Sequence, residues 1–568
     1  MKTKSTFSIG FILCLFLSLL LTGLILSTIL MDSVPPVDRD ALTHHLFIPK
    51  MWLKHGGIHE IPENIFSYYP MNLDLLYTIP LYFNNDIVPK YIHYIFALLT
   101  GWIIFFHLKM RLGTNYGLLG ALFFLSVPII IKLSITVYVD LGLVFFSTSA
   151  LIILLHWVES NFQWRFLLLA GFCCGMASGT KYNGILSTII LSLFVPILHE
   201  QNKKKEKSNS RAFLYVFVFI VITIATFSPW LIKNYIWTGN PIYPLHNSLF
   251  QKIRIPNVSQ QILPTAEIRS TSQKVSSQGG NAFLERKILY NEPWWQTIFL
   301  PFRFFYEGQD DNPQYFDGKL TPFLLILPFL ALIAKPLDSR QCREQKYLFL
   351  FALLYLLLTI FQYAIRIRYI TPIIPSLVIL SMYGLKGLFD KVLSWKKCTG
   401  RNKIIIFLLV ASLPILMLSY NGIYIVDLFK TTNPLPYLRG EVSRDDYIAN
   451  FRPEYPAIQY ANSILLPEAK VMCLFLGNRG YYMNFEPVFE QPFGSGVFSN
   501  FFKTGMQNKN ILDTINKKNI SYVLMRDDLT MSWFQQLHNE DKLLVAPFLA
   551  KAEKPLFTRN GYTFFQMK

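Results

Sequence analysis

A short polar stretch holds the residue types most suited to chemistry. Residues 32–52 read DSVPPVDRDALTHHLFIPKMW and follow directly on an apolar segment. A carboxylate such as Asp40 can take a proton from a hydroxyl or amine that attacks a carbon centre. Asp is also a common helix cap, and Asp40 precedes an apolar-aromatic stretch able to form an interfacial helix. Both roles stay open for Asp40 on these grounds.

Other ionisable residues stand at the ends of apolar segments. Asp140 occurs in TVYVDLGLVFF, Lys181 in the glycine-flanked turn SGTKYNG, and Arg366 and Arg368 in QYAIRIRYITPIIP. Glycine lets a backbone approach a phosphate closely, and ammonium and guanidinium groups neutralise phosphate charge. A capping role for Asp140 and a lysine that merely extends to the membrane surface are the alternatives. We expect phosphate binding by Lys181 and by at least one arginine.

The adjacent histidines His44 and His45 allow two interpretations. They could join Asp40 in a metal site, but adjacent side chains seldom point the same way, so we expect hydrogen bonding to substrate. Asp74, further along the same loop, is another candidate for substrate binding. No cofactor is indicated, and a divalent metal ion held by Asp40 or Asp140 stays open. No GxGxxG, P-loop, HExxH or GxSxG motif occurs in a supporting context, so nucleotide-dependent chemistry is not expected.

The elements that position these residues are membrane helices. Of the 568 residues, 52% are hydrophobic and only 15% are charged, which is too apolar for a soluble protein of this size. The formal charge of +18 does not indicate a nucleic-acid partner, because the basic residues lie between apolar runs. The six cysteines include no CxxC pair and indicate neither a disulfide framework nor a zinc site.

Eleven apolar segments are predicted to cross the membrane. The first ends near Met31 and is interpreted as an uncleaved anchor, because its core is longer than that of a signal peptide. The other ten are residues 91–107, 116–131, 140–157, 166–180, 184–198, 213–229, 320–334, 347–364, 370–385 and 404–420.

The distribution of Lys and Arg sets the predicted orientation. Basic clusters occur in alternate loops, which places those loops and the N-terminus in the cytoplasm. The first loop (31–90), the long loop (232–319) and the C-terminal tail are then outside. Ionisable groups gathered at one membrane surface mark function. We therefore expect an extracytoplasmic site that handles an anionic lipid headgroup.

The tail differs in character from the rest of the chain. Residues 470–476 and 521–525 are strand-like, and residues 510–518 are helix-like. We expect a transmembrane catalytic domain over residues 1–420 and a small extracytoplasmic α/β domain over residues 421–568.

The ordered motifs resemble one superfamily of enzymes. The segments DRDALTHHLFIPKMW, NIFSYYPMNLDLLY, YVDLGLVFF, GMASGTKYNGIL, SPWLIKNYIWTGNPIYP and, in the tail, GNRGYYMN follow one another as in GT-C glycosyltransferases. The similar members are protein O-mannosyltransferases and the bacterial aminoarabinose and lipopolysaccharide-core transferases. The resemblance implies a polytopic α-helical bundle, interfacial helices in the outer loops and a polyprenyl-phosphate-sugar donor.

The resemblance also implies roles for individual residues. Asp40 matches the carboxylate that serves as catalytic base, and Asp140 matches a second carboxylate near the site. Lys181 matches the residue that contacts the lipid phosphate, assisted by Arg366 or Arg368.

The chain departs from the family pattern at two positions. Ala41 replaces the Glu that follows the first-loop Asp in many relatives, and Asp74 stands where close relatives often have Glu. These departures leave the metal dependence open.

The function expected is transfer of a sugar from a polyprenyl-phosphate-linked donor to an acceptor outside the bacterial inner membrane. The acceptor is lipid A, a surface glycan or a protein. The alternatives are a polysaccharide polymerase or ligase, which would depend on arginines in a late loop, and a lipid-linked sugar transporter, which would place charges at mid-membrane. An inactive scaffold is the third alternative.

Overall fold

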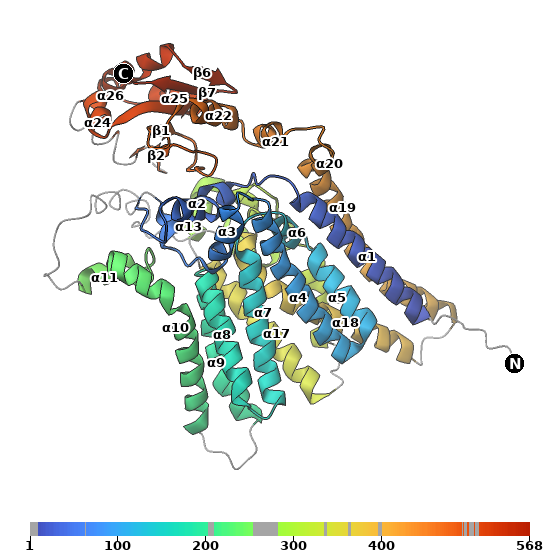
Figure 1. Cartoon of the computed structure of the whole chain (residues 1–568). Helices are drawn as coiled ribbons and strands as arrows, with labels where there is room; N and C mark the ends of the chain where they lie inside the picture. Colours follow the sequence, from blue (N-terminus) through green and yellow to red (C-terminus); the bar gives the residue numbers. More distant parts are fainter. Residues whose placement is uncertain are drawn as a thin grey trace.

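The chain folds into a bundle of long helices with a small α/β unit over one end (Figure 1). We call this the site end of the bundle. The structure is a computed structural model. It describes residues 9–62, 64–202, 210–253, 282–333, 338–361, 365–395, 400–490, 492–493, 497–498, 502, 505 and 510–567.

Each of the eleven segments predicted to span the membrane overlaps a helix of the bundle. Most of these helices extend a few residues beyond the predicted limits, and the last one continues to Thr432, past the predicted boundary at residue 420. They are α1 (Ile9–Asp32), α4 (Val88–Leu112), α5 (Thr114–Ser126), α7 (Asp140–Glu159), α8 (Trp164–Thr180), α9 (Gly184–Asn202), α10 (Ser210–Thr238), α16 (Phe323–Ile333), α17 (Ser339–Ile360), α18 (Ile374–Ser394) and α19 (Gly400–Thr432).

Seven helices in the described part of the chain are long and apolar enough to cross a membrane by themselves. They lie in α1, α4, α7, α9, α10, the stretch Ile367–Ser394, and α19. A bent pair formed by α5 and α6 (Pro128–Ser134) raises the number to eight, and Phe323–Leu332 is a shorter apolar helix. The protein is therefore a multi-pass membrane protein, while the count of eleven crossings and their orientation stay predictions.

The bend between α5 and α6 has a local cause. Val127, which precedes Pro128, has an extended ψ of 129°. A residue before proline is disfavoured in the helical region, whereas proline itself is favoured in the first turn of a helix. The chain therefore ends α5 at Ser126, turns by 68° and begins α6. Through this bend α6 and the turn that follows it contribute to the site end.

The first loop forms short helices packed against the bundle. Ala41, Leu46, Leu73 and Tyr77 are buried in one apolar cluster with Val139 of the turn before α7. The helices are η1 (Ala41–His45, a π-helix), α2 (Phe47–Lys54), η2 (Ile65–Tyr68) and α3 (Asn72–Tyr82). This burial fixes the predicted catalytic loop on the bundle.

Two further connections lie at the same end. Between α10 and α16 the described elements are α11 (Asn247–Ile253), α13 (Ala282–Tyr290), α14 (Trp294–Ile298), α15 (Leu300–Arg303) and η4 (Pro313–Tyr315). Residues 254–281 of the predicted long loop lie outside the described residues. The second connection is the 3-10 helix η5 (Ile367–Ile373), which joins α17 to α18.

The tail forms a five-stranded sheet in the order β2-β1-β5-β7-β6, flanked by helices. Strand β1 pairs in parallel with β2 and β5, and β7 pairs antiparallel with β5 and β6. The strands are β1 (Lys470–Leu474), β2 (Glu486–Glu490), β5 (Ile520–Arg526), β6 (Phe557–Arg559) and β7 (Tyr562–Gln566), with β3 (Pro492–Phe493) and β4 (Val497–Phe498) forming a separate pair. The helices are α20 (Pro434–Leu438), α21 (Arg444–Phe451), α22 (Tyr455–Ile464), α24 (Ile511–Lys517), α25 (Asp527–Gln536) and α26 (Asn539–Ala550).

Alternation along the strands explains this small unit. Successive side chains of a strand point to opposite faces. In β1, Met472 and Leu474 enter one apolar cluster, while Val471 and Cys473 enter another. Both faces of the sheet are thus covered, as expected for an α/β unit. The strands predicted at residues 470–476 and 521–525 coincide with β1 and β5.

The α/β unit is joined to the first loop by hydrogen bonds to backbone carbonyls. The Lys50 ammonium donates to the carbonyls of Tyr481 (2.8 Å) and Met483 (2.9 Å). The Tyr481 amide donates to the Leu42 carbonyl at 3.2 Å, and the Tyr482 hydroxyl donates to the Pro36 carbonyl at 2.7 Å. The loop after β1 is therefore held directly above η1 and α2.

The native cysteines allow a test of the predicted orientation. Cys342, near the start of α17, is exposed and lies in a loop predicted to be cytoplasmic, whereas Glu441 is exposed in the tail. In right-side-out membrane vesicles we expect a membrane-impermeant maleimide to leave the wild type unlabelled until the vesicles are opened. A Glu441→Cys variant should be labelled in sealed vesicles. Labelling of Cys342 in sealed vesicles would show that the predicted orientation is wrong.

Candidate active site

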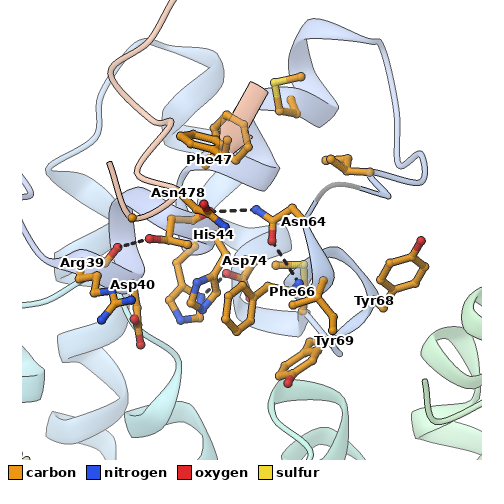
Figure 2. A pocket seen from close by; sticks show the side chains of 18 of the residues that line it. Arg39, Asp40, His44, Phe47, Asn64, Phe66, Tyr68, Tyr69, Asp74 and Asn478 are labelled. Carbon is orange, nitrogen blue, oxygen red and sulfur yellow. Dashed lines mark hydrogen bonds and ion pairs between the residues drawn. The ribbon is translucent and has the colours of Figure 1, made fainter. Parts of the chain in front are cut away.

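A large cavity lies between the site end of the bundle and the tail unit. Its volume is about 1690 Å³, and its walls come from the first loop, the turns before α7 and α9, the connection η5 and the tail. Figure 2 shows Asp40, His44 and Asp74 from the first loop around this pocket, with Asn478 of the tail beside them. Seven of the eight predicted site residues line it: Asp40, His44, His45, Asp74, Lys181, Arg366 and Arg368. The eighth, Asp140, is buried behind Lys181.

Asp40 and Arg368 form an ion pair across the cavity wall. The Arg368 Nη1 donates to Asp40 Oδ2 at 2.5 Å, although the two residues are 328 positions apart in the sequence. Their side chains are only 20% and 14% exposed. Asp40 immediately precedes the π-helix η1, and its side chain makes no capping hydrogen bond there. The capping alternative for Asp40 thus finds no support, and its carboxylate is directed to the site.

The ion pair with Arg368 favours the ionised form of Asp40. Burial by itself would raise the pKa of this carboxyl, but the charge of Arg368 and its hydrogen bond outweigh burial and hold the pKa well below its usual range. A carboxylate in that state is a weak proton acceptor. Any role of Asp40 as a base therefore requires that its contact with Arg368 be weakened.

A second ion pair joins Asp140 to Lys181. The Lys181 ammonium donates to Asp140 Oδ1 at 2.6 Å, and the aspartate is 1% exposed while the lysine is 18% exposed. Asp140 starts α7, where a negative charge is favoured by the helix dipole. Asp140 thus places the ammonium group at the cavity surface without lining the cavity itself.

His93 helps to fix the start of α7. Its Nε2 accepts a hydrogen bond from the Leu141 amide at 3.0 Å, so this nitrogen carries no proton. Its Nδ1 therefore carries the ring proton and donates to the Thr136 carbonyl at 2.9 Å. The side chain is completely buried and ties the turn before Asp140 to α4.

Aromatic rings hold the two cations close to each other. The Lys181 ammonium lies 5.0 Å from the centre of the Tyr369 ring, and the Arg368 guanidinium lies 5.4 Å from the same centre. Arg368 also lies 5.4 Å from the centre of the Tyr138 ring. Cations are attracted to aromatic faces. The rings thus position both cations independently of their carboxylate partners.

His45 and Asp74 form a buried hydrogen-bonded pair. The distance from His45 Nδ1 to Asp74 Oδ1 is 2.7 Å, and both side chains are buried. Burial lowers the pKa of His45 to about 3 and raises that of Asp74 to about 7. Because both shifts disfavour charge, we describe this contact as a hydrogen bond and not as a salt bridge.

His44 differs from its neighbour. It stacks on Phe66 with ring centres 4.3 Å apart, and its buried Nδ1 has no hydrogen-bond partner. Burial lowers its pKa to about 3, so the ring is neutral at physiological pH. The two histidine rings have different further partners, but they also contact each other, with ring centres 4.0 Å apart.

Arg366 is the more peripheral arginine. It pairs with Asp317 at 3.1 Å, and its side chain is 32% exposed, against 14% for Arg368. The sequence left open which arginine assists Lys181, and the geometry favours Arg368.

The sequence did not single out several residues that line the cavity. Lys132 of α6 pairs with Asp311 at 3.1 Å, and Arg452 donates to the Val37 carbonyl. Nothing in their local sequence distinguishes them from other surface charges. For Asn478 the sequence did carry a signal, because the pair Gly477–Asn478 is typical of a turn. In the structure both residues adopt the left-handed conformation, Gly477 with φ of 66° and Asn478 with φ of 61°.

The two carboxylates considered for a metal ion do not fit a metal site. Each already pairs with a cation, Asp40 with Arg368 and Asp140 with Lys181. Among the described residues no group of three or more His, Cys, Asp or Glu side chains is arranged to hold a metal ion.

Comparison with known proteins gives a family match and a fold match. A family model described as dolichyl-phosphate-mannose-protein mannosyltransferase matches residues 81–232, which include Asp140 and Lys181. A search of curated proteins gives no significant match.

Among solved structures, ArnT from Cupriavidus metallidurans bound to undecaprenyl phosphate matches with a TM-score of 0.58 and 12% identity. The match covers 97% of this chain and 98% of that chain. The apo form of the same protein gives a TM-score of 0.55 with the same identity and coverage. The archaeal oligosaccharyltransferase AglB from Archaeoglobus fulgidus gives 0.44 at 13% identity, covering 96% of this chain and 74% of that chain. The ArnT-like fold thus extends over nearly the whole chain.

The fold and the cavity define a multi-pass membrane protein with paired acidic and basic groups at one end of its bundle. Within this fold, residues 81–232 are similar to the dolichyl-phosphate-mannose-protein mannosyltransferase family, and nearly the whole chain is similar in fold to ArnT.

Asp74 gives a testable pH dependence of stability. Its pKa is about 7 in the folded protein against an ordinary 3.8, so the folded state binds the proton more tightly than the unfolded state. Between about pH 4 and 7 the contribution of Asp74 to stability therefore falls as pH rises. We expect the melting temperature of the wild type to decline relative to that of Asp74→Asn over this window. A difference independent of pH would show that Asp74 is ionised throughout.

Proposed function

We propose that the protein transfers a sugar from a polyprenyl-phosphate-linked donor to an acceptor on the extracytoplasmic side of a bacterial inner membrane. The observation that carries this proposal is the pairing of Asp40 with Arg368 beside Lys181 at one cavity. Two cations suit the phosphate of the donor, and the carboxylate suits the acceptor proton. The family match describes a dolichyl-phosphate-mannose enzyme and the fold match includes a complex with undecaprenyl phosphate, both of which support a lipid-linked donor.

The reaction proposed is a single displacement. Asp40 takes the proton of an acceptor hydroxyl or amine as that group attacks the anomeric carbon of the sugar. The bond from this carbon to the phosphate oxygen breaks, and Lys181 and Arg368 stabilise the negative charge on the leaving phosphate. No covalent enzyme intermediate is needed.

The surrounding residues orient the substrates. His44 and His45 are neutral and line the cavity, so their rings can contact the sugar. The tail forms part of the cavity wall, so we propose that it contacts the acceptor. The acceptor classes proposed are lipid A, a surface glycan and a protein segment.

A polysaccharide polymerase or ligase is the alternative function. Such an enzyme would depend on late-loop arginines and would not need Asp40. The direct Asp40–Arg368 contact favours the transferase, because the first-loop carboxylate shares the site with the late-loop arginine. A transporter is disfavoured because the ionisable groups of the cavity lie at the site end of the bundle rather than along its length.

Replacement of the base tests the proposal in cells. We expect Asp40→Asn to abolish one envelope glycoform, with a loss of about a hundredfold or more, and to cause its polyprenyl-phosphate sugar to accumulate. Mass spectrometry of lipids, glycans and proteins at matched expression measures both. Asp390→Asn is the control, because Asp390 pairs with Lys386 in the last part of α18, remote from the cavity. An unchanged profile from folded Asp40→Asn would remove Asp40 as the base.

The two arginines should differ in the same assay. We expect Arg368→Ala to reduce the product far more than Arg366→Ala, because Arg368 is the less exposed and contacts Asp40. Equal losses, combined with an active Asp40→Asn variant, would favour the polymerase or ligase.

A further inference from the structure

Both cations assigned to the donor phosphate are already neutralised by carboxylates of the protein. Arg368 pairs with Asp40 at 2.5 Å and Lys181 pairs with Asp140 at 2.6 Å. The two pairs differ in position, because Asp40 lines the cavity while Asp140 does not. A phosphate entering the cavity therefore meets Asp40 as a direct competitor for Arg368. Asp140 is not in the same position, because it lies behind Lys181 and does not line the cavity.

The guanidinium of Arg368 has contacts besides its ion pair with Asp40. Its Nη1 donates to Asp40, but its buried Nε has no hydrogen-bond partner. Contacts with the rings of Tyr138 and Tyr369 hold the group in place from other directions. Loss of the Asp40 contact thus leaves the guanidinium positioned by both rings.

The resting pair also suppresses the basicity that the reaction requires. While Arg368 contacts Asp40, the charge of the guanidinium stabilises the ionised carboxylate and opposes its protonation. A phosphate oxygen that takes over the guanidinium removes most of this stabilisation. The same event adds negative charge to the site, which further favours proton uptake by Asp40.

We propose that the donor phosphate and Asp40 compete for Arg368, so that donor binding releases the carboxylate to act as the base. This inference rests on the proposed function and adds an order to it. In the absence of donor, Asp40 is held by Arg368 and cannot accept a proton. Once the phosphate occupies Lys181 and Arg368, Asp40 is free beside the sugar.

The cycle balances in protons and charge. The acceptor proton moves to the freed Asp40, the new bond to the anomeric carbon forms, and the bonding electrons leave with the phosphate oxygen. When the polyprenyl phosphate dissociates, Arg368 returns to Asp40 and lowers its proton affinity. The proton then passes to water, and the resting pair is restored.

Competition for Arg368 predicts the effect of removing its partner. Undecaprenyl phosphate, as the probe, would be titrated against the purified full-length chain in lipid nanodiscs. We expect Asp40→Asn to bind it about tenfold more tightly than the wild type, because an amide competes only weakly with a charge-assisted hydrogen bond. Asp390→Asn should bind like the wild type. Thermal unfolding of each variant reports its folding, and Asp40→Ser replaces Asp40→Asn if the latter is unfolded.

A double-variant comparison assigns the effect to Arg368. We expect Arg368→Gln to weaken binding, and Asp40→Asn combined with Arg368→Gln to bind no more tightly than Arg368→Gln alone. Equal or weaker binding by folded Asp40→Asn would overturn the proposed competition. A tightening that persists without Arg368 would overturn it as well, since it would reflect general charge repulsion. Failure of the wild type to bind undecaprenyl phosphate would instead contradict the proposed function.

Discussion

The pairing of opposite charges at the site end of the bundle is the constraint on which the rest of the structure depends. Ionisable groups near the hydrocarbon region are costly unless they are paired. The Asp40–Arg368 contact joins the first loop to η5, and the Asp140–Lys181 contact joins α7 to the turn before α9. Each pair therefore connects segments far apart in the sequence and presents one cation to the same cavity. The cations that satisfy the electrostatic requirement of the fold are the same ones that we propose to bind the donor phosphate.

The first loop connects the bundle to the tail unit. On one side its apolar residues, such as Leu46 and Leu73, pack against the start of α7. On the other side Lys50 binds carbonyls of the loop after β1. The loop bearing Asp40 is thus held from both sides, and Asn478 is brought to the cavity that Asp40 lines (Figure 2). This arrangement makes the tail a wall of the site rather than a separate appendage.

Much of the fold follows from local sequence, whereas the partners within the site do not. Apolar length predicted the helices, and short strand-like runs predicted β1 and β5, because both signals depend on neighbouring residues. The types and spacing of Asp40, Lys181 and Arg368 indicated chemistry at one surface. Their actual partners depend on packing between distant segments. The contacts of Lys50 could not be predicted at all, since it binds backbone carbonyls, which every residue carries.

The central claim is that Arg368 exchanges Asp40 for the phosphate of the donor. The most direct test is an electron cryo-microscopy structure of the full chain with undecaprenyl phosphate bound. The account predicts the phosphate between Lys181 and Arg368, with Asp40 beyond hydrogen-bonding distance of the guanidinium. A phosphate bound elsewhere, or bound at these cations while the 2.5 Å contact between Asp40 and Arg368 persists, would contradict it.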